Sequence, residues 1–267
     1  VCLSKGEENI NRRRALLVSI GIVVTTILSL VTAARRHGAM LDSESAGRGL
    51  DQLRLSCPNV PARPPYAEKA RRARWMVHTL EWGVLSSIST RLSGDAPVPF
   101  GNIYSFSDGP CDASSGVPYM FASDLDQSMK DIKENSMVSL TLSEAELSGP
   151  LLPDECVVGG QKGYGDPENP PCARLVLTGE FLKLSPPSDD SSEHGDKKEW
   201  EFAHQALAKR HPSMAKMPAN HKPFIGKILL RDIWFIDMYG GATIIDLDEY
   251  YAASPSDEGV GDDEESV

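Results

Sequence analysis

The sequence predicts a mainly β domain of the α+β class, in which a largely antiparallel sheet closes on itself. About six runs of apolar and β-branched residues, separated by Gly-, Pro- and Asp-rich turns, are typical of strands. A few short stretches have helical spacing, and one of them is inserted between the third and fourth runs. Such a sheet is expected to close, because closure removes exposed edges.

The elements are expected in the following order. The folded part opens at RPPY (63–66), where two prolines lead into a helix over residues 67–80. Strands are predicted over residues 82–89, 100–107, 117–123, 136–143, 173–185 and 227–241. Gly179 indicates a bend or bulge in the fifth strand. Helices are predicted over residues 124–136 and 200–212, and a final strand or turn over residues 243–252.

The N-terminal region contains an uncharged apolar segment, residues 15–34, between Arg12–Arg14 and Arg35–Arg36. About 20 helical residues span roughly 30 Å, the thickness of a bilayer core. The segment therefore predicts either a transmembrane signal anchor or a cleaved signal peptide. Both alternatives place the residues that follow in a lumen or outside the cell, and an uncleaved anchor makes a single-pass type II membrane protein with a cytosolic tail over residues 1–14.

The remaining boundaries follow from composition. Residues 35–60 are polar and are predicted to be a stalk, residues 61–253 to be the folded domain, and residues 254–267 to be an acidic disordered tail. The formal net charge of −11 argues against nonspecific binding to nucleic acid, so we expect no nucleic-acid partner.

Cysteine usage fits an oxidising compartment. Cys156 and Cys172 enclose a Gly-, Pro- and Asp-rich loop that has no core of its own, so this pair is the disulfide candidate. Closing a loop of about 15 residues would stabilise the fold by roughly 3 kcal/mol. No Cys or His spacing suggests a zinc site.

The stretch SDGPCDASSGVPY (107–119) lies between two predicted strands and raises the question of a nucleophilic Cys111. A nucleophilic thiol needs a base and a lowered pKa, whereas the acidic neighbours Asp108 and Asp112 would raise the pKa of this thiol. A loop thiol or a disulfide partner of Cys57 is the favoured interpretation. The stretch matches neither of the glycine-rich phosphate motifs GxGxxG and GxxxxGK[ST].

Other candidate residues have simpler explanations. Metal binding was considered for His204, His211 and His221, but no acid stands at zincin spacing, so surface or capping roles are favoured and no metal site is predicted. The basic run of the first helix could be a phosphate patch, but a solvated face is favoured for its members Lys69, Arg71, Arg72 and Arg74. No catalytic constellation is predicted.

Several ordered motifs carry a family resemblance, among them SFSDGP (105–110), SGVPYMFAS (115–123), ENSMVSLTLS (134–143), DPENPPC (166–172) and IWFIDMYGG (233–241). On these motifs the chain resembles the CREG family, the cellular repressor glycoproteins of the endolysosomal and secretory route, over roughly residues 61–252. One departure is that no Asn begins an N-x-[ST] glycosylation sequon.

The resemblance implies the FMN-binding split β-barrel fold, similar to pyridoxamine 5′-phosphate oxidase, and a homodimer formed through the barrel face. It also implies a lysosomal or extracellular protein that binds no flavin, has no established reaction and acts through unknown protein partners in growth or differentiation control. The alternative is an FMN-dependent oxidoreductase. In that case the resemblance assigns the flavin phosphate to Ser123, Gln127 and Lys130, where a missing cation weakens the binding.

Overall fold

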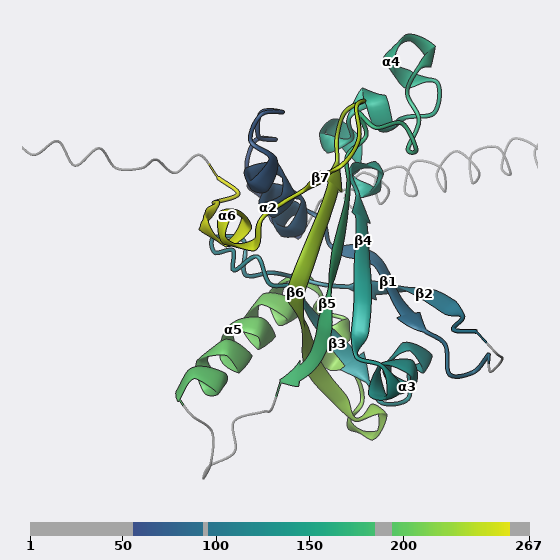
Figure 1. The fold of residues 1–267 in the computed structure, drawn as a ribbon. Helices are drawn as coiled ribbons and strands as arrows, with labels where there is room; N and C mark the ends of the chain where they lie inside the picture. Colours follow the sequence, from purple (N-terminus) through teal and green to yellow (C-terminus); the bar gives the residue numbers. More distant parts are fainter. Residues whose placement is uncertain (1–55, 93–95, 185–193, 257–267) are drawn as a thin grey trace, which may run out of the picture. The chain divides into compact units, whose positions relative to one another are not determined.

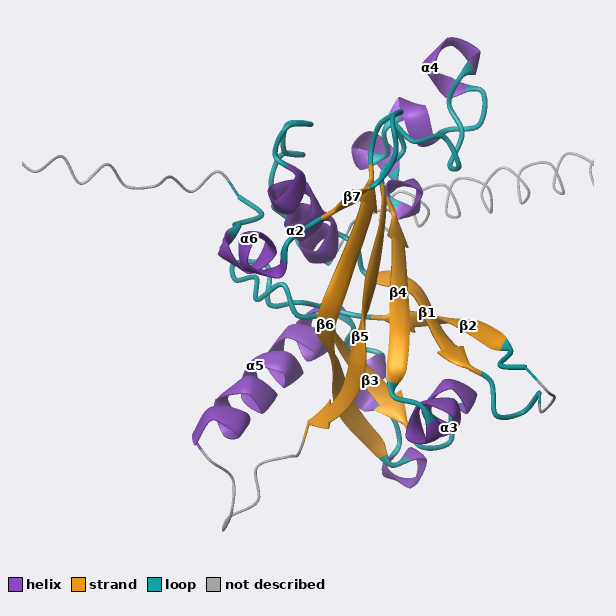
Figure 2. Ribbon diagram, in the orientation of Figure 1, coloured by secondary structure: helices purple, strands orange, loops and turns teal. Residues whose placement is uncertain are grey.

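The computed structural model describes residues 56–92, 96–184 and 194–256, which form a curled antiparallel sheet with short helices against it (Figure 1). The strands are β1 (Trp82–Ile88), β2 (Pro99–Ser105), β3 (Tyr119–Ser123), β4 (Met137–Ser143), β5 (Arg174–Leu184), β6 (Pro223–Ile236) and β7 (Thr243–Ile244). The helices are α2 (Lys69–Thr79), α3 (Gln127–Glu134), α4 (Gly160–Gly163), α5 (His194–Arg210) and α6 (Leu247–Ala252), as Figure 2 shows.

The strand order is β2-β1-β4-β5-β6-β3, and β7 adds to β6. All these pairs are antiparallel. The two end strands, β2 and β3, come into contact, but the link between them is an isolated bridge from Ser107 to Tyr119. A barrel that closes without a continuous hydrogen-bonded seam is a split β-barrel, so the predicted fold class is confirmed.

The core lies on the inner face of this sheet. Burial alternates along the strands, as in β4, where Val138, Leu140 and Leu142 are buried and the residues between them are half-buried. Helix α2 packs into the same core through Ala73, Met76 and neighbouring side chains. This period-two burial is expected when one face of an antiparallel sheet is packed and the other is open.

The structure confirms most predicted elements and corrects three. Helix α5 begins at His194 rather than 200. Strand β6 begins at Pro223 rather than 227 and ends at Ile236 rather than 241. Residues 243–252 form the short β7 and then helix α6, whose Asp246 side chain accepts from the backbone N–H groups of Asp248 and Glu249. A register shift beside Gly179 confirms the predicted bulge; a Cβ there would lie 2.1 Å from the carbonyl oxygen of Leu229.

The boundary between the predicted stalk and the predicted domain lies before residue 61. Cys57, assigned to the stalk over residues 35–60, is joined by a disulfide to Cys111, so the folded region includes residues before 61. The tail over 1–14, the apolar segment 15–34 and most of the acidic tail 254–267 lie outside the described residues. Among the helices that the structure describes, none is long and apolar enough to cross a membrane.

Candidate functional site

The loop over residues 107–119 is organised around the buried carboxylate of Asp108. One oxygen lies 2.8 Å from Nδ1 of His78, and the other accepts from the Ser114 hydroxyl and from the backbone N–H of Gly116. Asp108 is fully buried and His78 nearly so. A buried carboxylate with this many donors is satisfied. The Ser114 hydroxyl contacts the aspartate rather than the imidazole, so the three side chains do not form a Ser-His-Asp relay.

Two further contacts hold the loop from outside. Cys111 is bonded to Cys57, so it is no free thiol and the nucleophile hypothesis fails. Gly116 has φ +75, and a Cβ there would lie 2.7 Å from Nε of Arg74. Glycine is therefore required both for the left-handed backbone and for the close approach of the guanidinium.

The basic residues of α2 are not a solvated face, and that prediction is wrong. Arg72 is 4% exposed and Arg74 is 3% exposed. Arg72 bonds Asp237 at 2.8 Å and Glu144 at 3.2 Å, while Lys69 bonds Asp237 at 2.6 Å. These carboxylates come from distant strand ends, so nothing near α2 in the sequence indicates that the cations are paired. Because each is paired, α2 offers little free charge to a phosphate.

Both terminal nitrogens of Arg74 donate to oxygens of distant segments, whereas its Nε is buried without a partner among the described residues. Its guanidinium donates to the carbonyls of Ser114, Tyr250 and Tyr251, at 3.0 to 3.3 Å. Arg74 thereby ties α2 to the 107–119 loop and to α6. Tyr250 of α6 makes a second contact with this loop, because its hydroxyl donates to the carbonyl of Gly116 at 2.8 Å.

The flavin candidates Ser123, Gln127 and Lys130 lie at the end of β3 and on α3, but two of them already have partners. The Ser123 hydroxyl donates to the carbonyl of His221 at 2.5 Å. The Gln127 amide donates to Asp131 at 2.7 Å. Lys130 is exposed.

The N-terminus of α3, where a phosphate would be expected to sit, carries carboxylates instead. Asp126 caps the helix by accepting from the backbone N–H of Ser128 at 2.7 Å and also accepts from the Tyr104 hydroxyl. Burial alone would raise the pKa of Asp131, but hydrogen bonds from Thr90, Gln127 and Ser87 lower it overall. The capping position is thus occupied by the Asp126 side chain, and the lowered pKa of Asp131 favours a second negative charge within the same helix. The geometry therefore fits a flavin phosphate poorly.

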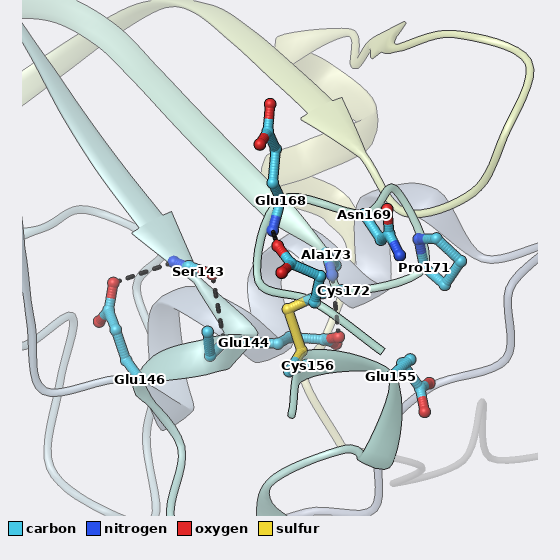
Figure 3. Close-up of a disulfide and its surroundings, with 12 residues drawn as sticks. Ser143, Glu144, Glu146, Glu155, Cys156, Glu168, Asn169, Pro171, Cys172 and Ala173 are labelled. Carbon is cyan, nitrogen blue, oxygen red and sulfur yellow. Dashed lines mark hydrogen bonds between the residues drawn. A yellow bond between two sulfur atoms is a disulfide. The ribbon is translucent and has the colours of Figure 1, made fainter. Parts of the chain in front are cut away.

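The segment over residues 144–173 leaves the sheet between β4 and β5 and returns through the Cys156–Cys172 disulfide (Figure 3). This is the pair that the sequence predicts. Glu144, fully buried at the base of the segment, accepts from the backbone N–H of Ala173 at 3.2 Å and is paired with Arg63. Arg63 also reaches Glu155 at 2.9 Å, so one guanidinium links the base of the segment to its disulfide.

Glu146 occupies an unusual position in the same segment. One carboxylate oxygen accepts from the backbone N–H of Ser143 at 3.0 Å, as Figure 3 shows, and the other is buried without a partner in the described part of the chain. Burial raises the pKa of Glu146 to about 8, against the lowering effect of the Ser143 hydrogen bond. At neutral pH this side chain is therefore largely protonated.

The histidines considered for metal binding are dispersed. His211 Nε2 lies 2.8 Å from the carbonyl oxygen of Phe106, and burial lowers the pKa of this imidazole. His204 stacks on Trp200 with ring centroids 4.9 Å apart, and His221 is exposed. Among the described residues, no group of three or more His, Cys, Asp and Glu side chains is arranged to hold a metal ion.

Comparison with known proteins decides the family. Residues 64–252 match the model of the family described as "CREG, beta-barrel". The chain belongs to the CREG family. Protein CREG1 of Gallus gallus is 36% identical over 194 residues, which cover 72% of this chain and 90% of that protein. Protein CREG1 of Homo sapiens is 33% identical over 241 residues, which cover 89% and 94%.

The second CREG paralogue and a solved structure extend the comparison. Protein CREG2 of Mus musculus is 34% identical over 222 residues, covering 82% of this chain and 69% of that protein. A heme binding protein from Mycobacterium smegmatis superposes with a TM-score of 0.48 and 14% identity, covering 72% of this CREG chain and 62% of that structure.

Sequence reasoning missed the residues that organise the CREG domain. The sequence indicates Asp108 only as an acidic neighbour of Cys111, although it holds His78 and Ser114 in a buried cluster. Trp75, one of the largest fully buried side chains, was not singled out. The signal for the C-terminal helix was present, because Asp246 followed by Glu249 has the spacing of a helix cap.

Proposed function

We propose that this CREG-family chain is a non-catalytic split-barrel protein of the lumen or extracellular space, which forms a homodimer and acts through protein partners. By family resemblance, its setting is the endolysosomal and secretory system, and its role is control of growth or differentiation. The two disulfides fit a secreted or luminal protein. The observation that carries the proposal is an apolar row on the open face of the sheet.

This row crosses the sheet with one side chain from each strand on its path. Strand register aligns, in order, Ile103, Val84, Thr141, Val176, Trp234 and Ile244. The inner neighbours of these residues, such as Leu85 and Leu175, fill the core, so the row faces outward. Ile103 is 64% exposed and Ile244 is 61% exposed.

Five of the six residues are apolar, Thr141 is polar, and the four residues between the exposed ends are half-buried. Isolated exposed apolar residues are normal on protein surfaces, whereas apolar residues aligned across one sheet face favour an interface. The face of a curled sheet is self-complementary when a second copy is placed against it by a two-fold axis, since both copies then present the same residues. The row therefore supports a homodimer through the barrel face.

The buried acids support a structural rather than a catalytic role for the polar clusters. Asp108, Asp131 and Glu144 each accept several hydrogen bonds or ion pairs within the protein. A buried carboxylate whose oxygens already accept such contacts is poorly placed to reach a substrate.

The dimer is tested by light scattering of the purified chain. Val176→Glu places a charge in the middle of the row and is expected to convert a dimer to a monomer, because burying an unpaired carboxylate is strongly unfavourable. Lys130→Glu, on the exposed face of α3, is the matched control and leaves the dimer intact. A wild-type chain that is monomeric at micromolar concentration would refute the homodimer.

The alternative function is an FMN-dependent oxidoreductase, which family resemblance and exposed Lys130 support. The visible absorption spectrum of the purified chain separates the two proposals. The non-catalytic protein is expected to be colourless and to stay so after incubation with FMN. A flavin band at about one flavin per chain, lost in Gln127→Ala/Lys130→Ala, would establish the alternative and overturn our proposal.

A further inference from the structure

A cavity of about 520 Å³ lies between α5, the end of β3 and the 3₁₀ turns that follow α5. Its walls are mainly aromatic and aliphatic, and they include Phe121, Trp200, Met214, Met217 and Phe224. None of the flavin candidates Ser123, Gln127 and Lys130 lines it, although the Ser123 hydroxyl bonds one of the turns beside it. Cavities of a few hundred Å³ with apolar walls and a few polar groups are typical of small-molecule sites.

The helical wall of the cavity is fixed at both ends. Near the start of α5, Glu199 accepts from Lys227 at 2.7 Å and from the Tyr119 hydroxyl at 3.1 Å. At its end, Arg210 donates to the carbonyls of His78, Thr79 and Leu80. Trp200, next to Glu199, is therefore held by a helix that is anchored on β3 and β6 near its start and on the end of α2 at its last residue.

The loop wall is fixed as well. His211, before the first 3₁₀ turn, is bonded to the carbonyl of Phe106, and the Ser123 hydroxyl bonds the carbonyl of His221 in the second. A cavity whose walls are held by such contacts exists before a ligand arrives. Binding then costs little in ordering of the protein.

Charge is concentrated at one end of the cavity. Lys183 and Lys222 line this end together with Asp124, the sole acidic residue among the lining side chains. Lys133 bonds Asp124 at 3.1 Å, and this bond, with the nearby charges of Lys183 and Lys222, lowers the pKa of Asp124. The lining of the cavity therefore carries two lysines and one acid, and that acid is already bonded to Lys133, although the whole chain carries a net charge of −11.

The two lysines also border the apolar walls. The ammonium of Lys183 lies 4.1 Å from the centroid of the Phe224 ring. Lys222 precedes Pro223 and Phe224, which also line the cavity. Trp200 stacks on His204 with ring centroids 4.9 Å apart, and Phe121 meets the same imidazole edge-on at 6.2 Å, so these rings form an aromatic wall. An occupant must therefore be apolar or aromatic along its body and anionic at one end.

We propose that this cavity binds an amphipathic carboxylate, with its anionic group at Lys183 and Lys222 and its apolar body against Phe121 and Trp200. An alkyl carboxylate such as a fatty acid and an aromatic carboxylate share this chemistry.

The test uses the purified chain and the dye 8-anilinonaphthalene-1-sulfonate, which has an aromatic body and one anionic group. Saturable binding at about one dye per chain is expected. Lys183→Gln and Lys222→Gln are each expected to weaken it by up to about fivefold, the usual strength of a partly exposed ion pair. Lys209→Gln, an exposed lysine of α5 outside the lining, leaves it unchanged.

Two comparisons separate this site from general dye adhesion. The neutral dye N-phenyl-1-naphthylamine is expected to bind without sensitivity to either lysine substitution. Ala215→Trp fills the cavity and abolishes binding of both dyes, whereas Ala219→Trp, on an exposed position outside the lining, does not. Dye binding that survives Ala215→Trp, or that is insensitive to both lysine substitutions, would overturn the proposal.

Competition experiments distinguish an alkyl carboxylate from an aromatic carboxylate as the ligand. Displacement of the anionic dye by laurate indicates an alkyl ligand, and displacement by 1-naphthoate indicates an aromatic one. Either result supports the proposal, and failure of both at concentrations that saturate dye binding to the wild-type chain contradicts it.

Discussion

The disulfides of this protein close two loops that are held in different ways. Cys57–Cys111 joins residues 54 apart, and its second cysteine lies in the 107–119 loop, which surrounds the buried Asp108. Cys156–Cys172 joins residues 16 apart in the 144–173 segment, where Val158 is 76% exposed and Tyr164 is 75% exposed. The first loop is held by buried polar contacts and a disulfide together, whereas the tip of the second depends on its own turns and the disulfide.

This difference shows how a covalent link and a buried polar cluster contribute separately to stability. Buried polar clusters are worth most when every member is satisfied, and removing one member leaves its partners unpaired. A disulfide acts largely on the unfolded chain, and its effect grows with the length of the loop that it closes. The two loops should therefore respond differently to matched substitutions.

The largest effect is expected from Asp108→Ala. This change leaves His78, the Ser114 hydroxyl and the Gly116 N–H without their acceptor in a buried site. Breaking such a buried cluster costs about 3–5 kcal/mol in the free energy of unfolding. Urea denaturation measures it. Asp112→Ala, an exposed acid of the same loop, should stay within about 0.5 kcal/mol of the wild type, and an equal loss in both variants would contradict the role of Asp108.

The next effect is expected from Cys57→Ser/Cys111→Ser. Releasing a loop with a separation of 54 residues costs about 4 kcal/mol in the loop-entropy model. The loss should appear in the global unfolding free energy, because the 107–119 loop is packed against α2 and α6. A transition midpoint in urea that matches the wild type would show that the Asp108 cluster holds the loop without the disulfide.

A smaller global effect is expected from Cys156→Ser/Cys172→Ser. In the loop-entropy model, losing a disulfide with a separation of 16 residues lowers the free energy of unfolding by about 3 kcal/mol. Much of that should be lost as local opening, because the tip of the 144–173 segment is exposed and buries little. Limited proteolysis should cut the variant between Val157 and Tyr164 while the barrel stays intact. If cleavage is no faster than in Cys57→Ser/Cys111→Ser, the two loops do not differ as proposed.

The smallest effect is a pH dependence located in the 144–173 segment. The folded-state pKa of Glu146 is raised from 4.5 to about 8. The folded state therefore binds the extra proton between these pH values, and its stability decreases as pH rises through that window. Each unit of pKa shift is worth about 1.4 kcal/mol in a fully buried site. Glu146 is only half-buried, so solvent screening reduces the effect, and the wild type should lose about 1 kcal/mol between pH 5 and pH 8 relative to Glu146→Gln. Parallel stability curves for the two proteins would show that Glu146 does not titrate in this range.

Features that depend on residues close together in the chain could be predicted from the sequence. Period-two patterns located the strands, because burial alternates along each strand. Gly179 marked the bulge, since a side chain there would collide with the backbone of β6. Composition alone indicated the Cys156–Cys172 pair, because the loop between them has few apolar side chains with which to hold itself. The ordered motifs also carried the family.

Contacts between residues far apart in the sequence became visible only in the folded protein. Arg72 meets Asp237 across 165 residues, and Lys69 meets the same carboxylate across 168, so a helix that reads as a solvated basic face is buried and neutralised. Gln127, matched to a phosphate by family resemblance, donates to Asp131 instead. The cavity beside α5 likewise depends on anchors from distant strands. The physical reason is common to these cases, since a polar side chain is positioned by whichever partner the fold brings within hydrogen-bond distance.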